Sequence, residues 1–152
     1  MVSEKFQKNG LFRILKQIFT VEFLILLLWI PCVIFIFKFI DDRKIAGLVA
    51  GTGFLFIPVI NIFRERLHRN AHPSSRLARV FASGAFFLLS ALPIFLFRVF
   101  NWEKNLEDIS IFGILSGRQL HSLSNIIFVG MVLVYFVTNI IDTIIDAKKA
   151  KP

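Results

Sequence analysis

The sequence contains little of what disulfide frameworks and reactive sites are built from. Its 152 residues include one cysteine, three histidines, one tyrosine and two tryptophans. A single cysteine excludes an intramolecular disulfide and a CxxC redox pair. No nucleophile, base and orienting group occur at a recognisable catalytic spacing. The sequence therefore predicts no catalytic residue, no cofactor and no metal site, and we expect a protein that is not an enzyme.

Charge is also scarce, while apolar side chains are abundant. Charged residues make up 18% of the chain, against about 25% in ordinary soluble domains. Apolar residues make up 56%, nineteen of them phenylalanine, and the mean hydropathy is +0.72. One core of this length cannot hide so much apolar surface, so lipid is the expected solvent. This composition excludes a disordered chain, a disulfide scaffold and a cytosolic Rossmann-type enzyme.

Four apolar segments are long enough to cross a bilayer as helices, since about 20 residues at 1.5 Å each span the roughly 30 Å hydrocarbon layer. We predict one all-α integral membrane domain of residues 1–152, with four transmembrane helices in an antiparallel bundle. Ser116 and Gln119 have the spacing of a capping box at the start of the last helix. The predicted helices are 21–40, 45–63, 80–100 and 117–148, with 126–145 as the membrane part of the last.

The distribution of basic residues predicts the orientation. Twelve of the 18 Lys and Arg lie before the first span, between the second and third spans, or in the tail, and six lie on the other side. Because basic residues accumulate on the cytoplasmic side, we expect a multi-pass protein with both termini cytoplasmic, in the inner or plasma membrane if the source is bacterial. No nucleic-acid-binding motif accompanies the charge, so no nucleic-acid partner is expected.

Residues 6–19 have the pattern of an amphipathic helix, with apolar side chains on one face and basic ones opposite. We predict that this helix lies in the cytoplasmic interface and contacts anionic lipid; docking on a partner protein is the alternative. The residues expected at lipid interfaces are Phe12, Arg13, Lys16 and Trp102.

Small residues cluster in the second and third spans, where they let helix backbones approach closely. The expected helix-packing face consists of Gly47, Gly51, Ser83 and Gly84. This face serves either packing within the chain or association with another subunit, and the sequence leaves both open.

Polar residues form one candidate site, at the non-cytoplasmic ends of the last two spans. Its members are Arg98, Glu103, Arg118 and His121. Such a mixed-charge group either binds a ligand or forms an ion-pair belt at the membrane surface. At the opposite side we expect Glu65, His68 and His72 in a solvated basic loop, and Asp142 as a carboxylate that reaches the interface from a helix end.

The function predicted from these patterns is that of a non-catalytic four-helix membrane protein, a subunit or scaffold of a larger membrane assembly. Its expected partners are membrane lipids and either other membrane subunits or further copies of the chain. One alternative is a small transporter or channel that forms its path by oligomerisation. A second alternative is a membrane enzyme that acts on a lipid at the outer surface.

Overall fold

The computed structural model describes residues 15–16, 18–67, 71–102, 104, 110–111 and 113–149. Most of these residues are helical, and a short strand pair, β1 (Ser110–Ile111) with β2 (Leu115–Ser116), precedes the last helix. A π-helical turn, η1 (Phe87–Ala91), joins two of the helices into one segment. The α-helices are α2 (Val21–Phe39), α3 (Arg43–Leu67), α4 (Pro73–Phe86), α5 (Leu92–Phe100) and α6 (Gly117–Lys149).

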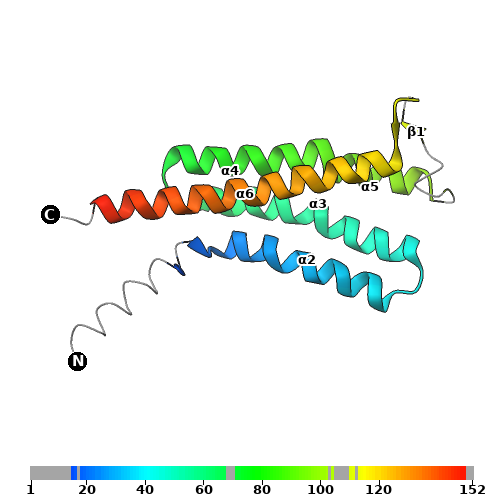
Figure 1. Cartoon of the computed structure of the whole chain (residues 1–152), viewed down its shortest axis with the longest axis horizontal. Coiled ribbons are helices and arrows are strands. Elements are labelled where there is room, and N and C mark those ends of the chain that lie inside the picture. Colours follow the sequence, from blue (N-terminus) through cyan, green and yellow to red (C-terminus); the bar gives the residue numbers. More distant parts are fainter. Residues whose placement is uncertain are drawn as a thin grey trace.

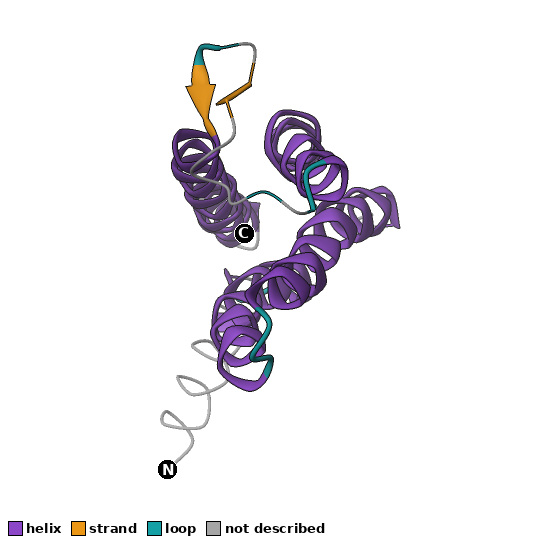
Figure 2. Cartoon of the chain, turned by 90° about the vertical axis from the view of Figure 1, so that its right-hand side faces the viewer, coloured by secondary structure: helices purple, strands orange, loops and turns teal. Residues whose placement is uncertain are grey.

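Four helical segments of the described chain are long and apolar enough, by length and composition, to cross a membrane: α2, α3, the continuous α4–η1–α5 segment, and α6. The segments lie side by side, and the chain reverses direction at each connection (Figure 1). Figure 2 shows the segments from one end: α3 contacts both α2 and the α4–η1–α5 segment, and α4 contacts α6. We refer to the two ends of the molecule as the α3–α4 end and the α2–α3 end, after the connections found there.

Side-chain caps fix three helix starts. The Thr20 hydroxyl accepts a hydrogen bond from Phe23 N at 3.4 Å, and an Asp42 carboxylate oxygen accepts one from Lys44 N at 2.8 Å. These groups satisfy amides that a helix start leaves unpaired. The predicted capping box of α6 is confirmed, because Ser116 N donates to Gln119 Oε1 at 2.9 Å and Gln119 N donates to Ser116 Oγ at 3.3 Å.

The third helical segment starts at Pro73, seven residues before the predicted 80–100 span. Proline suits the first turn, where its missing N–H has no helical partner to lose. Farther along, Pro93 crowds the carbonyl four residues before it, and the wider turn η1 lies directly ahead of this proline. The early start brings Arg76 and Arg79 into α4, although they were expected in the preceding connection.

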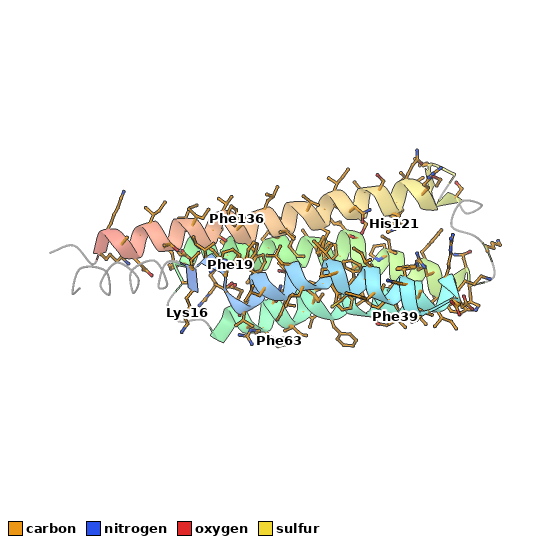
Figure 3. All side chains as sticks on the ribbon, turned by 60° about the horizontal axis from the view of Figure 1, so that its bottom comes forward. Lys16, Phe19, Phe39, Phe63, His121 and Phe136 are labelled. Atoms are coloured by element: carbon orange, nitrogen blue, oxygen red, sulfur yellow. The ribbon has the colours of Figure 1, made fainter. Side chains whose placement is uncertain are left out.

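The core is small and rich in aromatic side chains. Phe54 on α3, Phe86 on α4 and Phe128 on α6 meet pairwise, with ring centroids 5.4–6.0 Å apart. Phe23 and Leu26 of α2 are buried beside them. Only 17% of the most apolar stretch of α2 is buried, and side chains such as Phe39 and Phe63 are exposed (Figure 3). Most of the apolar surface therefore faces outward.

The predicted N-terminal helix 6–19 lies largely outside the described residues. Leu15, Lys16 and Ile18 are described, and they are helical. Lys16 is exposed and lies toward the α3–α4 end of the molecule (Figure 3).

Candidate functional site

Polar side chains are buried where α3, α4 and α6 meet, near the α3–α4 end. The buried residues of α4 are Ser75, Arg79, Ser83 and Phe86, which recur every three or four positions and so share one face. Opposite this face lie Glu65 near the end of α3 and a polar stretch of α6. The result is an ionic cluster enclosed by helices, which we call the Arg79 network.

Arg79 is the centre of this network. Its Nε lies 2.9 Å from Glu65 Oε1 on α3, and its Nη1 lies 3.2 Å from Asp142 Oδ2 on α6. Nη1 also donates to Asn139 Oδ1 at 2.8 Å and to Thr138 Oγ1 at 3.3 Å. The planar guanidinium can serve several acceptors at once, so one side chain connects three helices.

Further polar contacts extend the network to the remaining helix. Glu22 in the first turn of α2 pairs with Arg64 of α3, with Oε1 and Nε 2.6 Å apart. Asn139 Nδ2 donates to the backbone oxygen of Ile18 at 2.8 Å, which connects α6 to the segment before α2. One turn deeper, the hydroxyls of Ser83 and Tyr135 lie 3.0 Å apart. All four spanning segments are thus joined near one end.

The Arg79 network corrects one expectation from the sequence, for Glu65, and adds an ion pair to another, for Asp142. Glu65 was expected in a solvated loop, yet it is 3% exposed and paired with Arg79. Asp142 was expected to reach the interface; it pairs with Arg79, and its side chain remains 17% exposed. His68 lies outside the described residues, and His72 directly precedes α4. Pro73 is the first residue of α4.

Burying an arginine together with its carboxylate partners has a large unfavourable free energy of dehydration. Each charge loses hydration, and the loss is offset only where the partner geometry is good. In a membrane such groups are rare and mark either a structural tie or a functional pathway.

Asn61 on α3 belongs to the same end: it is fully buried, and neither amide atom has a hydrogen-bond partner among the described residues. Within the described ranges, no three His, Cys, Asp or Glu side chains are grouped so that they hold a metal ion.

A cavity of about 220 Å³ lies at the α2–α3 end, between α2, α3, α6 and the η1–α5 segment. Its walls are mostly apolar, and its polar lining groups are Arg98, His121, Ser124 and Asn125. Ser124 is engaged by Ser90 of η1, with the two hydroxyl oxygens 2.5 Å apart. The remaining polar lining groups come from α5 and α6.

The sequence-predicted polar group is only partly brought together at this cavity. Arg98 and His121 both line it, whereas Arg118 is exposed and is not among its lining residues. His121 lies on α6 toward this end of the molecule (Figure 3). Glu103 lies outside the described residues.

The four residues of the predicted packing face have different surroundings. A Cβ on Gly47 would overlap the Arg98 guanidinium, and a Cβ on Gly51 would meet Phe95 at 3.5 Å. Ser83 is fully buried and bonded to Tyr135. A Cβ on Gly84 would have no neighbour within 4 Å.

Of the predicted lipid-interface residues, Phe12 and Arg13 lie outside the described range, while Lys16 and Trp102 are exposed.

The Arg79 network was not predicted, although the sequence contains a signal for it. Ser75, Arg79 and Ser83 recur at intervals of four, and Tyr135, Thr138, Asn139 and Asp142 recur at three or four on the last helix. Two polar stripes at helical spacing are typical of facing surfaces in a bundle. Assigning Arg79 to a loop concealed the first stripe.

These features define a helical chain whose segments are long and apolar enough to cross a membrane four times, with a buried ionic network at one end and a largely apolar cavity at the other. No model of a protein family, no curated protein and no solved structure matches this chain significantly. The functional conclusions therefore rest on the network, the cavity and the exposed apolar surface.

Proposed function

We infer that this chain is a non-catalytic membrane protein that acts as a subunit or scaffold in a larger membrane assembly. Its four spans form an antiparallel bundle with both termini on the cytoplasmic side, and residues 6–19 form a helix in the cytoplasmic interface. The α3–α4 end is then the cytoplasmic end. The positive-inside distribution of Lys and Arg supports this orientation.

The observation that carries the proposal is that the buried charges pair with one another between helices. Arg79 pairs with Glu65 and Asp142 across three helices, and Arg79 is only 4% exposed. A group that performs acid–base chemistry needs access to its substrate or to water. Charges that are paired and enclosed in this way instead fix the relative positions of helices, which is what a scaffold requires.

The outward-facing surface of α2 supports contact with another protein. No residue of α2 beyond Leu26 is buried, and its exposed side chains include Leu28, Ile34 and Phe35. Membrane helices associate by close packing of such surfaces in addition to solvation by lipid. We therefore assign α2 as the contact surface for the partner subunit.

A matched cross-linking experiment tests this assignment. A photoreactive amino acid is placed at Phe35 of α2 or at Leu133 of α6, which are both 55% exposed. We expect one discrete protein adduct from Phe35 and none from Leu133 in native membranes. Protein adducts from neither position, together with a monomeric chain after mild extraction, contradict the proposal.

A transporter or channel built from several copies is the second candidate. The fully buried Asn61 amide favours it, because its two amide atoms have no hydrogen-bond partner among the described residues, and polar side chains inside a span often mark a solute or ion pathway. Within one chain, however, the Phe54, Phe86 and Phe128 rings occupy the interior between the Arg79 network and the cavity. A symmetric homo-oligomer with ion or solute flux in proteoliposomes supports this candidate and contradicts the scaffold.

A further inference from the structure

The cavity at the α2–α3 end has one polar and one apolar extremity. On α3 it runs from Gly47 to Phe54, on the η1–α5 segment from Arg98 to Ala91, and on α6 from His121 to Phe128. The ends of each stretch are seven residues apart, or about 10 Å along a helix axis. On η1–α5 and α6 the basic side chain comes at the end of the molecule and the apolar residue comes deeper. On both elements, therefore, the cavity lining changes from basic to apolar in the same direction, from the end of the molecule inward.

Arg98 supplies the charge at the polar extremity. Its guanidinium reaches from α5 to the backbone of α3 and occupies the space where a Cβ of residue 47 would lie, so the glycine makes room for it. Among the residues that the structure describes, no carboxylate lies within 4 Å of Arg98. This contrasts with Arg79, whose charge is offset by two carboxylates. Arg98 is therefore a half-buried cation that lines a cavity without a charge partner in this part of the chain.

We propose that this cavity binds one anionic phospholipid, with an acyl chain between the helices and the phosphate on Arg98. A guanidinium binds phosphate oxygens with two parallel N–H donors. The ring of His121 lies at the same extremity and offers a further donor, and the amide of Asn125 lines the cavity about one turn deeper. The volume, about 220 Å³, exceeds the roughly 150 Å³ of apolar cavities that take up benzene. Its depth of about 10 Å fits within the roughly 15 Å hydrocarbon layer of one leaflet.

The arrangement of the helices gives a lipid a route from the bilayer. A contact between α2 and α6 lies in the half nearer the α3–α4 end, where the Phe23 and Phe136 ring centroids are 5.8 Å apart. Toward the other end, the α2–α3 pair diverges from α6 (Figure 1). Val33 and Phe37 of α2 line the cavity on this side. The acyl chain of a lipid can therefore enter the cavity laterally, between α2 and α6, without leaving the hydrocarbon layer.

Two pairs of variants test the proposal in nanodiscs of phosphatidylcholine containing a small fraction of phosphatidylglycerol. The first pair is Arg98→Gln, which removes the proposed phosphate donor, and Arg43→Gln, which removes an exposed charge at the same end. The second pair is Val33→Trp, which fills the cavity, and Ile34→Trp, which adds the same bulk to the 64%-exposed neighbouring position. Binding of phosphatidylglycerol is measured by native mass spectrometry and by titration.

We expect the wild-type chain to retain one phosphatidylglycerol. Loss of a charge-assisted hydrogen bond weakens binding about tenfold in Arg98→Gln, while Arg98→Lys recovers part of it. Val33→Trp should abolish retention, and both control variants should bind within about twofold of wild type. Val33 is not part of the buried core, so Val33→Trp decides the question even if Arg98→Gln does not fold.

Four outcomes overturn the proposal. The first is equal binding by Arg98→Gln and wild type, and the second is an equal loss in both members of either pair. The third is displacement of the lipid by millimolar inorganic phosphate, which indicates an anion site with no role for the acyl chain. The fourth is a dimer without bound lipid, which indicates that a second copy covers the cavity.

Discussion

Arg79 Nε and Glu65 Oε1 lie 2.9 Å apart, and both side chains are 4% exposed. The pair joins α4 to α3 inside a chain whose composition is dominated by apolar residues. Because both charges have lost their hydration, neither can be removed without leaving the other buried and less well compensated. The first prediction follows from this relationship.

Replacing Arg79 with leucine should lower the free energy of unfolding by about 3–5 kcal/mol, the usual cost of removing one partner from a buried ion pair. Arg76 provides the control, because it lies on the same helix and is exposed. Arg76→Leu should change stability by less than about 0.5 kcal/mol. Thermal unfolding in one detergent, followed by circular dichroism, compares the variants. Equal melting temperatures for the two variants contradict the assignment of Arg79 as the structural centre.

Gly53 and Gly84 should respond in opposite directions to alanine. A Cβ at Gly53 would overlap the Trp29 ring, whereas at Gly84 it would meet nothing within 4 Å. Gly53→Ala should therefore destabilise the protein by about 1–3 kcal/mol through overpacking, and shift the tryptophan fluorescence. Gly84→Ala should stabilise it by about 0.5–1 kcal/mol, because alanine is the better helix former. Destabilisation by Gly84→Ala would mean that this glycine packs closely against another helix.

The hydrogen bond between Ser83 and Tyr135 should appear as a coupling in a double-mutant cycle. Ser83→Ala and Tyr135→Phe each remove one hydroxyl from a buried pair 3.0 Å apart. Each single change leaves the other hydroxyl without this partner, so the two losses should exceed the effect of the double variant by about 1 kcal/mol. Additive effects indicate that the two hydroxyls are satisfied independently.

The helical class could be predicted from the sequence because it follows from composition and run length alone. Four apolar runs of sufficient length correspond to four helical segments, and the capping box at Ser116 identified the start of α6 correctly. The start of α4 could not be obtained in this way. Arg76 and Arg79 lower the local hydropathy, and hydropathy cannot distinguish a charge in a loop from a charge buried against carboxylates on other helices.

The candidate sites depend on distances between helices that the sequence does not state. Arg98 and His121 were predicted to converge, and both line the cavity. The apolar walls of that cavity come from side chains that resemble any other lipid-facing residues until the helices are placed. The contacts of Arg79 with Glu65 and Asp142 likewise join residues that are far apart in the sequence. From the sequence alone, each of these charged residues would be assigned to the protein surface.

Topology provides a test of the proposed orientation. On a Cys32→Ser background, single cysteines are introduced at Asp41, in the α2–α3 connection, and at Ser74, at the start of α4. Both positions are exposed. We expect a membrane-impermeant thiol reagent to label position 41 in intact cells, and position 74 only after the membrane is opened. The reverse pattern contradicts cytoplasmic termini.

The mass of the particle that contains this chain tests the central proposal most directly. The chain is extracted from its own membrane into polymer-bounded lipid discs, without detergent, and the mass of the particle is measured together with its composition. A scaffold or subunit predicts the 17.5 kDa chain in a fixed ratio with at least one different membrane protein. A monomer, or a particle built only of copies of this chain, contradicts that role.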